Sequence, residues 1–307
     1  MLGGGTMGLG ITQALALSGV EVVLIGANAQ RARRAFARLE ERTRSQVETG
    51  LRPLEHMRIL DRVVATGELA TAVADVQLVI ESVPENLELK CELLKACARH
   101  APPEVVLATN TSSFPISRLA QAVPRPERFL GLHWFNPPEW VPGVEIIPSS
   151  QTDETVVTAC RGLLTTLGKE PVLVGDSPGF VANRLQYALL REALACVDEG
   201  IATPLEIDRT VRSCFGFRLP FFGPFQIADM AGLDIYLNVF QTLRDNLGDA
   251  FAPPAVLEDL VAQGRLGTKT GQGFYQWPDA ERPGLLANRD RKYARLARLL
   301  AEERDDT

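Results

Sequence analysis

The sequence predicts an α/β fold with a parallel, doubly wound sheet, followed by a second domain that is entirely helical. Three observations indicate this. Short runs rich in β-branched residues alternate with helical stretches through the first half of the 307-residue chain, as in sheets built from strand–helix–strand units. Strand signals almost vanish after residue 176. The chain length suits two domains better than one.

The first half contains the elements of the expected sheet domain, residues 1–176. Its candidate strands are apolar runs bounded by turn residues, and the stretches between them have helical periodicity. We expect strands at 20–24, 76–81, 105–108, 129–133, 144–148 and 171–174, and helices at 6–18, 30–47, 86–99 and 153–167.

The second half, residues 177–307, is expected to be helical throughout. The segment 175–179, Gly-Asp-Ser-Pro-Gly, is rich in turn residues and marks the boundary. We expect helices at 180–199, 204–215, 224–246, 254–263 and 286–304. The apolar face of the first of these suits a dimer interface or a core inside the domain.

The bulk composition excludes several function classes. A net charge of −6 does not favour nucleic acid, and no apolar run approaches the roughly 20 residues of a membrane helix. The 5 cysteines form no Cys-x-x-Cys pair and no histidine stands at metal-ligand spacing, so we expect small buried thiols and no metal. The start of the chain has no basic segment, which predicts a cytoplasmic protein without a signal peptide.

A glycine-rich loop opens the chain. Gly3, Gly5 and Gly8 fit the pattern G-x-G-x-x-G, with Thr6 and Met7 between the last two glycines. A helical run and then a strand follow, which is the context in which such a loop binds the pyrophosphate of a dinucleotide at a helix N-terminus. We therefore predict a Rossmann-like domain; the alternative is a glycine-rich start without a ligand.

Two features of this region depart from the usual pattern. Only Met1 and Leu2 precede the glycines, against roughly 5 residues in a usual strand. Either the true start lies upstream, with the first strand apparently truncated here, or the sheet has a gap. The next strand ends in Gly26, where an acid normally contacts the ribose. NAD is the expected cofactor, with NADP as the alternative because Arg31, Arg33 and Arg34 follow.

A histidine and a glutamate form the most informative pair in the chain. His133 closes an apolar strand, and Glu145 lies inside the next one, between Val144 and Ile146. A buried carboxylate needs a partner. A glutamate that accepts from one imidazole nitrogen fixes the tautomer and leaves the other nitrogen free as a general base. The pair therefore predicts removal of a proton from a hydroxyl.

Seven short segments, in this order and at this spacing, resemble the short-chain L-3-hydroxyacyl-CoA dehydrogenase family, which includes 3-hydroxybutyryl-CoA dehydrogenases. The resemblance runs from Gly3 to about Gln276. The matching segments are 3–8, 85–90, 110–113, 133–137, 144–145, 176–184 and 267–274.

The resemblance implies roles for particular residues. His133 matches the family's catalytic base and Glu145 its carboxylate partner. Ser112 matches a serine that contacts substrate and nicotinamide, and Asn183 an asparagine that contacts the substrate oxygen. The other matched cofactor contacts are Glu85, Lys90, Asn136 and Lys269.

The implied activity is reversible hydride transfer between a nicotinamide cofactor and the hydroxyl carbon of a 3-hydroxyacyl-CoA or a related hydroxy compound. The resemblance also implies a role in fatty acid metabolism and a homodimer formed through the C-terminal domain.

The substrate itself stays open at this point. Arg42 and Thr49 stand where the family has a serine and a lysine that contact CoA. The aromatic segment 215–225 suits either a core between domains or a bulky substrate wall. The segment 134–138 and the C-terminal helix resemble relatives that oxidise hydroxy acids, carnitine-like compounds or a pyridine-ring alcohol, so a dehydrogenase of such a compound is one alternative. The short start and Gly26 leave a non-catalytic family member as another.

Overall fold

The computed structural model describes residues 1–280 and 282–305, and of residues 282, 283 and 303–305 the backbone alone. The chain forms two compact units, Met1–Leu190 and Arg191–Thr307. The division falls inside α7 (Ala182–Asp198), because this helix starts against the sheet unit and ends in the helical one. The expected domain boundary at residue 176 stays a prediction.

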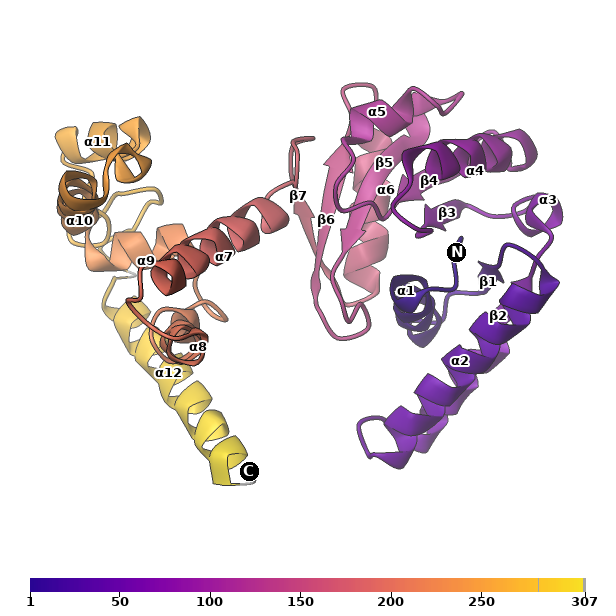
Figure 1. Cartoon of the computed structure of the whole chain (residues 1–307), viewed down its shortest axis with the longest axis horizontal. Helices are drawn as coiled ribbons and strands as arrows, with labels where there is room; N and C mark the ends of the chain where they lie inside the picture. Colours follow the sequence, from indigo (N-terminus) through magenta and orange to yellow (C-terminus); the bar gives the residue numbers. More distant parts are fainter. Residues whose placement is uncertain (281, 306–307) are drawn as a thin grey trace. The chain divides into compact units, whose positions relative to one another are not determined.

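The first unit contains a mixed sheet (Figure 1). Neighbouring strands are parallel except β5 and β6, which pair antiparallel. The expectation of an entirely parallel sheet was wrong at this pair, because the connection 135–142 is too short for the crossover of a dozen or more residues that parallel neighbours need. The strands are β1 (Val22–Ile25), β2 (Val63–Thr66), β3 (Leu78–Glu81), β4 (Val106–Thr109), β5 (Phe129–Trp134), β6 (Gly143–Pro148) and β7 (Glu170–Leu173).

The start of the chain fills the centre of the sheet. Leu2 forms parallel bridges to Ile25 of β1 and to Glu81 of β3. Its N–H donates to Ile80 O at 2.9 Å, and its carbonyl accepts from Ser82 N at 2.8 Å. Leu2 therefore takes the place of the missing strand and joins β2–β1 to β3–β4–β5–β6–β7 in the order of a doubly wound fold.

Helices cover both faces of this sheet. The four expected helices are α1 (Thr6–Leu17), α2 (Ala29–Glu48), α4 (Leu87–His100) and α6 (Glu154–Thr166). Asn28 and Asn86 cap α2 and α4, each side-chain oxygen accepting a backbone N–H at 2.9 Å. A further short helix is α5 (Ile116–Ala120). The sequence did not predict β2, α3 (Leu69–Ala72) or the 3₁₀ helices η1 (Leu54–Arg62) and η2 (Pro126–Arg128).

The second unit is helical, as predicted. Its small core contains Leu233, Leu257 and Leu260. The single helix expected over 224–246 was wrong, because Gly232 has a φ of 110° and divides it. The elements are the end of α7, α8 (Pro204–Ser213), η3 (Gly216–Arg218), α9 (Pro224–Ala231), α10 (Leu233–Leu247), η4 (Asp249–Phe251), α11 (Ala255–Ala262) and α12 (Arg282–Asp305).

In the part of the chain that the structure describes, none of the helices has the length and apolar character needed to cross a membrane.

Candidate functional site

The glycine loop has the geometry of a pyrophosphate site. Gly3 has a φ of 100°, and a Cβ on it would lie 2.5 Å from Ser82 O. A Cβ on Gly8 would lie 1.9 Å from Gly3 O, so both positions require glycine. A Cβ on Gly5 would meet nothing within 4 Å, and no side chain caps α1 there. Open backbone thus remains at the N-terminus of α1, where Thr6 and Met7 begin the helix, and it fits a dinucleotide phosphate.

The absence of an acid at Gly26 follows from close packing. A Cβ on Gly26 would lie 2.5 Å from Ala32 N and 2.8 Å from Ala32 Cα. A Cβ on Gly67 would lie 2.3 Å from Ala29 N. The start of α2 therefore packs on the ends of β1 and β2 at a distance that only glycine permits, and no side chain fits at the usual ribose-binding position.

A buried ion pair lies at the end of β3. Lys90 Nζ is 2.8 and 3.1 Å from the two carboxylate oxygens of Glu81, and the two side chains are 1% and 0% exposed. Glu81 also accepts from Thr109 Oγ1 and Val83 N, both at 2.7 Å. Lys90 Nζ also forms an ion pair with Glu85 Oε2 at 3.1 Å. These contacts anchor the loop that follows β3 to the end of β4.

Glu85 holds the loop that contains Ser112. Its Oε1 accepts from the backbone N–H groups of Ser112 and Ser113 at 3.2 Å each, from Ser113 Oγ at 2.7 Å and from Thr111 Oγ1. Burial opposes ionisation, but the hydroxyls of Thr111 and Ser113 and the ammonium of Lys90 hold the pKa of Glu85 below its ordinary value. A charged carboxylate therefore fixes the backbone beside Ser112, whose own side chain is exposed.

His133 and Glu145 are direct cross-strand neighbours in β5 and β6. His133 Nδ1 lies 2.8 Å from Glu145 Oε2, and both side chains are 6% exposed. Burial opposes the charge on Glu145, but hydrogen bonds from His133 and from two backbone N–H groups hold the pKa of Glu145 below its ordinary value. Since an ionised carboxylate only accepts, Nδ1 carries the proton and Nε2 is the free imidazole nitrogen.

The segment before α7 completes the arrangement. The N–H groups of Val181 and Ala182 donate to Glu145 Oε1 at 3.1 and 2.9 Å. Asn183 Nδ2 donates to Ser112 O at 3.1 Å. The structure thus brings four sequence-predicted residues together within the first unit: Ser112, His133, Glu145 and Asn183.

The remaining predicted cofactor contacts are Asn136 and Lys269. Asn136 is exposed at the start of the loop after β5. Lys269 belongs to the second unit, where its ammonium pairs with Asp234. The segment around Lys269 is held by the fully buried carboxylate of Asp229, which accepts from Phe274 N and Tyr275 N at 3.0 Å and from an indole N–H.

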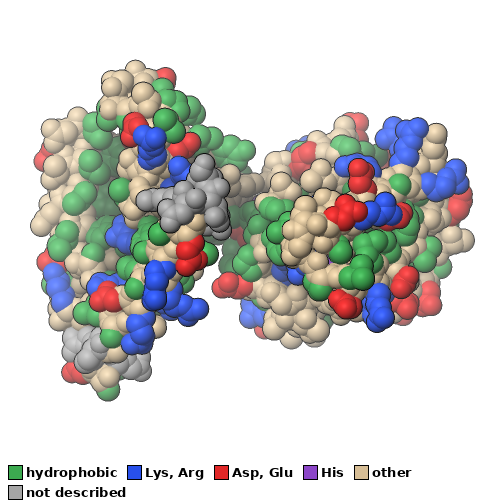
Figure 2. Space-filling model, turned by 90° about the horizontal axis from the view of Figure 1, so that it is seen from below, with side chains coloured by type: hydrophobic (Ala, Val, Ile, Leu, Met, Phe, Trp, Pro, Cys, Tyr) green, Lys and Arg blue, Asp and Glu red, His purple; other side chains and the backbone are tan. Residues whose placement is uncertain are grey.

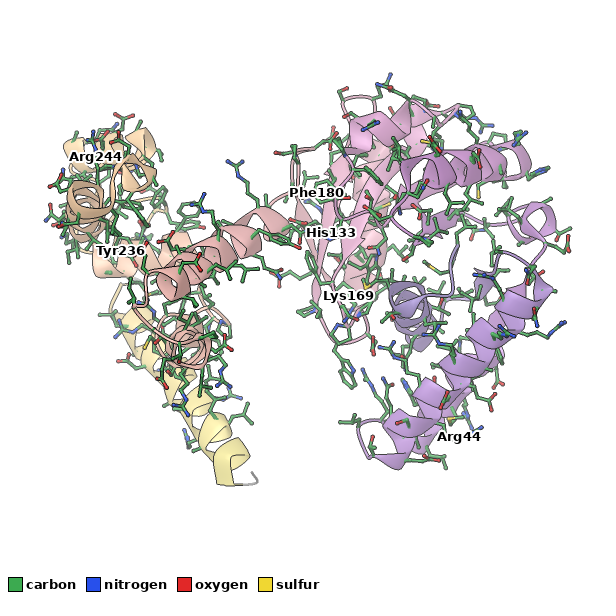
Figure 3. All side chains as sticks on the ribbon, viewed as in Figure 1. Arg44, His133, Lys169, Phe180, Tyr236 and Arg244 are labelled. Carbon is green, nitrogen blue, oxygen red and sulfur yellow. The ribbon has the colours of Figure 1, made fainter. Side chains whose placement is uncertain are left out.

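Sequence reasoning missed Glu81, Thr109 and Phe180. Glu81 is a lone carboxylate at the end of an apolar strand, with Lys90 on the helix that follows, and that pattern is a usable signal. Phe180 packs its ring on His133 (Figure 3), with ring centroids 5.4 Å apart. Nothing in the sequence distinguishes it from an ordinary core phenylalanine.

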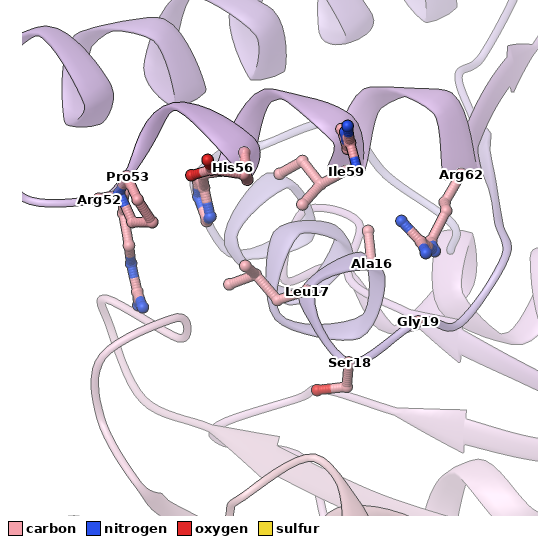
Figure 4. A pocket seen from close by; sticks show the side chains of 11 residues that line it. Ala16, Leu17, Ser18, Gly19, Arg52, Pro53, His56, Ile59 and Arg62 are labelled. Carbon is pink, nitrogen blue, oxygen red and sulfur yellow. The ribbon is translucent and has the colours of Figure 1, made fainter.

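A separate cavity of about 550 Å³ lies between the C-terminal end of α1 and η1 (Figure 4). Leu17 and Ile59 contribute apolar side chains to it, and Arg52, His56 and Arg62 contribute polar ones. Since α1 has 12 residues, this cavity is roughly 18 Å from the glycine loop. None of the predicted catalytic or cofactor residues lines it.

Two family models match the chain. The 3-hydroxyacyl-CoA dehydrogenase NAD-binding domain matches residues 1–177, and the C-terminal domain of the same family matches residues 179–277.

Similar proteins include the 3-hydroxybutyryl-CoA dehydrogenase of Bradyrhizobium diazoefficiens, 35% identical over 92% of this chain and 95% of that protein. A 5-formyl-3-hydroxy-2-methylpyridine 4-carboxylate 5-dehydrogenase of Mesorhizobium japonicum is also 35% identical, over 98% of this chain and 97% of that protein. Among solved structures, a 3-hydroxyacyl-CoA dehydrogenase of Archaeoglobus fulgidus is 32% identical over 98% of this chain and 97% of that chain, with a TM-score of 0.82.

Proposed function

Since the chain belongs to the 3-hydroxyacyl-CoA dehydrogenase family of NAD-dependent oxidoreductases, we propose that His133 and Glu145 perform its proton transfer. The observation that carries this proposal is the 2.8 Å contact between His133 Nδ1 and Glu145 Oε2. It leaves Nε2 free to accept the proton of a substrate hydroxyl. Glu145 stabilises the imidazolium that forms, because its carboxylate stays ionised in a buried site.

NAD, when bound, supplies the hydride acceptor, and the open backbone at Gly5 fits its pyrophosphate. In the proposal, the side chains of Ser112 and Asn183 donate to the substrate oxygen as negative charge develops on it. Asn183 is half-buried and already bonded to Ser112 O, so these two groups are positioned together. In the reverse direction His133 returns the proton.

The remaining cofactor contacts are also proposals. Glu85 and Asn136 are exposed at the ends of β3 and β5, where they suit contacts to the nicotinamide half of NAD. Lys90 is buried behind Glu85, so it acts by holding that carboxylate rather than by reaching the cofactor. The role of Lys269 requires its release from Asp234. The start of the chain, Gly3 to Gly8, takes the pyrophosphate.

We further propose a 3-hydroxyacyl thioester as the substrate, and with it a place in fatty acid metabolism and in the cytoplasm. Relatives named for such thioesters support this choice, although one relative is named for a pyridine compound. A panel of 3-hydroxybutyryl-CoA, free 3-hydroxybutyrate and an aromatic alcohol, followed by nicotinamide absorbance, tests the choice. Turnover of the free acid or the alcohol at a rate above that of the thioester contradicts it.

Replacement of the base tests the chemistry. We expect His133→Gln to reduce kcat by about a thousandfold, which lies within the range of general-base effects. NADH binding should be retained. His56→Gln is the matched control, because His56 is equally buried and bonds to Gln13 away from the pair. Equal turnover of His133→Gln and the parent contradicts the proposal.

A homodimer is the proposed assembly. No residue of α7 or α8 is buried, and hydrophobic side chains lie on the surface in Figure 2. The exposed apolar positions of α7 include Leu185 and Leu194, which suit a second copy of the chain. Light scattering should give a molar mass of twice 33.5 kDa for the parent. The Leu185→Glu variant should have half the mass of the parent, whereas Gln186→Glu should have the mass of the parent. A monomeric parent contradicts the proposal.

A further inference from the structure

Phe180 is the single non-glycine residue with a positive φ among the described residues, at 52°. It follows a Pro-Gly turn in which Gly179 has a φ of 74° and Phe180 N donates to Ser177 O at 2.8 Å. Such a turn needs a positive φ at its glycine but not at the residue after it. A bulky side chain in this backbone region stores strain, and strain of this kind persists only where the surroundings impose it.

The side chain of Phe180 lies against the imidazole of His133 (Figure 3). Phe180 is 2% exposed, and the two rings are inclined at 57° with centroids 5.4 Å apart. Phe135 is the other aromatic neighbour of the imidazole, with a centroid distance of 4.5 Å and an inclination of 55°. Two phenyl rings therefore limit the rotation of the His133 ring.

The backbone beside Phe180 serves the partner of His133. Val181 N and Ala182 N donate to Glu145 Oε1 at 3.1 and 2.9 Å. The start of the same segment is tied down by Asp176, whose carboxylate accepts the N–H groups of residues 116 and 117 at 2.8 and 2.7 Å. One short turn therefore presents a ring to His133 and two donors to Glu145.

We propose that Phe180 is a positioning residue for the proton transfer: its strained backbone holds the ring against His133, so that Nδ1 stays on Glu145 and Nε2 points to the substrate. This inference rests on the proposed role of His133 as the base. With a smaller side chain the imidazole gains rotational freedom and spends less time in the productive orientation. A misplacement of the order of 1 Å in such a group costs about a hundredfold in rate.

A purely structural role for Phe180 predicts a different result. Phe180 belongs to a hydrophobic cluster on one face of the sheet, together with Phe129. Phe129 is also fully buried, and no ring contact joins it to His133. Phe129→Leu is therefore the matched control for Phe180→Leu, and Phe180→Asn tests the backbone because asparagine tolerates a positive φ without supplying a ring.

The test measures kinetics and the histidine itself in the full-length protein. For Phe180→Leu and Phe180→Asn we expect kcat with 3-hydroxybutyryl-CoA and NAD to fall at least about tenfold per folded enzyme, with KM for NAD unchanged. The solvent deuterium isotope effect on kcat should rise, because proton transfer becomes slower. The Nδ1–H resonance of His133, assigned by its loss in His133→Gln, should broaden in both variants and stay sharp in Phe129→Leu.

The outcomes separate the inference from the proposed function. If Phe180→Leu has the same kcat and the same His133 resonance as Phe129→Leu, the inference is wrong. If Phe180→Asn has the kcat of the parent, the inference is also wrong, since a positive φ at this residue would then support turnover without the ring. Normal turnover in His133→Gln overturns the role of the base itself, and the resonance of His133 still reports whether Phe180 orients the ring.

Discussion

Lys90→Met should be among the most damaging single changes to this protein. It removes the counter-charge of Glu81, whose side chain is 0% exposed and lies 2.8 Å from Lys90 Nζ. After the change Glu81 keeps two neutral donors, Val83 N and Thr109 Oγ1. Breaking a buried ion pair by removing one partner typically costs about 3–5 kcal/mol of unfolding free energy.

Urea unfolding followed by far-ultraviolet circular dichroism at pH 7 tests this reasoning. We expect the variant to unfold with a free energy about 3–5 kcal/mol below that of the parent. Lys95→Met, an exposed lysine of the same helix, should change little. Adding Glu81→Gln to Lys90→Met should recover most of the loss. A deficit below about 1 kcal/mol, the size of an exposed ion pair, refutes the reasoning.

Three further predictions concern other sites. The pKa of Glu145 is lowered in spite of burial, chiefly by His133, from an ordinary 4.5. Its stabilisation is therefore present above that value and lost as pH falls through the folded-state pKa; in acid titrations of unfolding free energy, Glu145→Gln should flatten this loss. Asp229→Ala leaves three N–H donors without their acceptor and should lower the stability of the second unit by about 3 kcal/mol, and an unchanged melting curve would contradict this. Gly26→Asp should destabilise without tightening NAD binding in titrations, because a Cβ there lies 2.5 Å from Ala32 N. A stable variant with tighter NAD binding would show that α2 can move away from the end of β1 to make room for the side chain.

Most of the helices and strands could be predicted from local sequence patterns. The fold class was confirmed, and α1, α2, α4 and α6 begin and end within a residue or so of the expected positions, because their periodicity and capping residues are local signals. The exceptions have tertiary causes. The short strand β2 is defined by its pairing with β1 rather than by its sequence pattern. Leu2 joins the sheet because Ile25 and Glu81, on either side of it, form bridges with it.

The candidate site divides in the same way. His133 and Glu145 were paired from their residue types and spacing, and they are opposite each other in an antiparallel hairpin. The donors from Val181 and Ala182 were not foreseen, since they are backbone groups with no sequence signature. The catalytic and cofactor roles stay predictions that the variants above test.

By itself, the sequence determined the two-part architecture and the glycine loop, because periodicity and residue type are local properties. The tertiary structure alone decided what the predicted site residues contact. It closed the sheet with Leu2, excluded an acid at Gly26 and placed a strained phenylalanine on His133. Each of these depends on how closely segments distant in the chain approach one another, and close packing sets that distance.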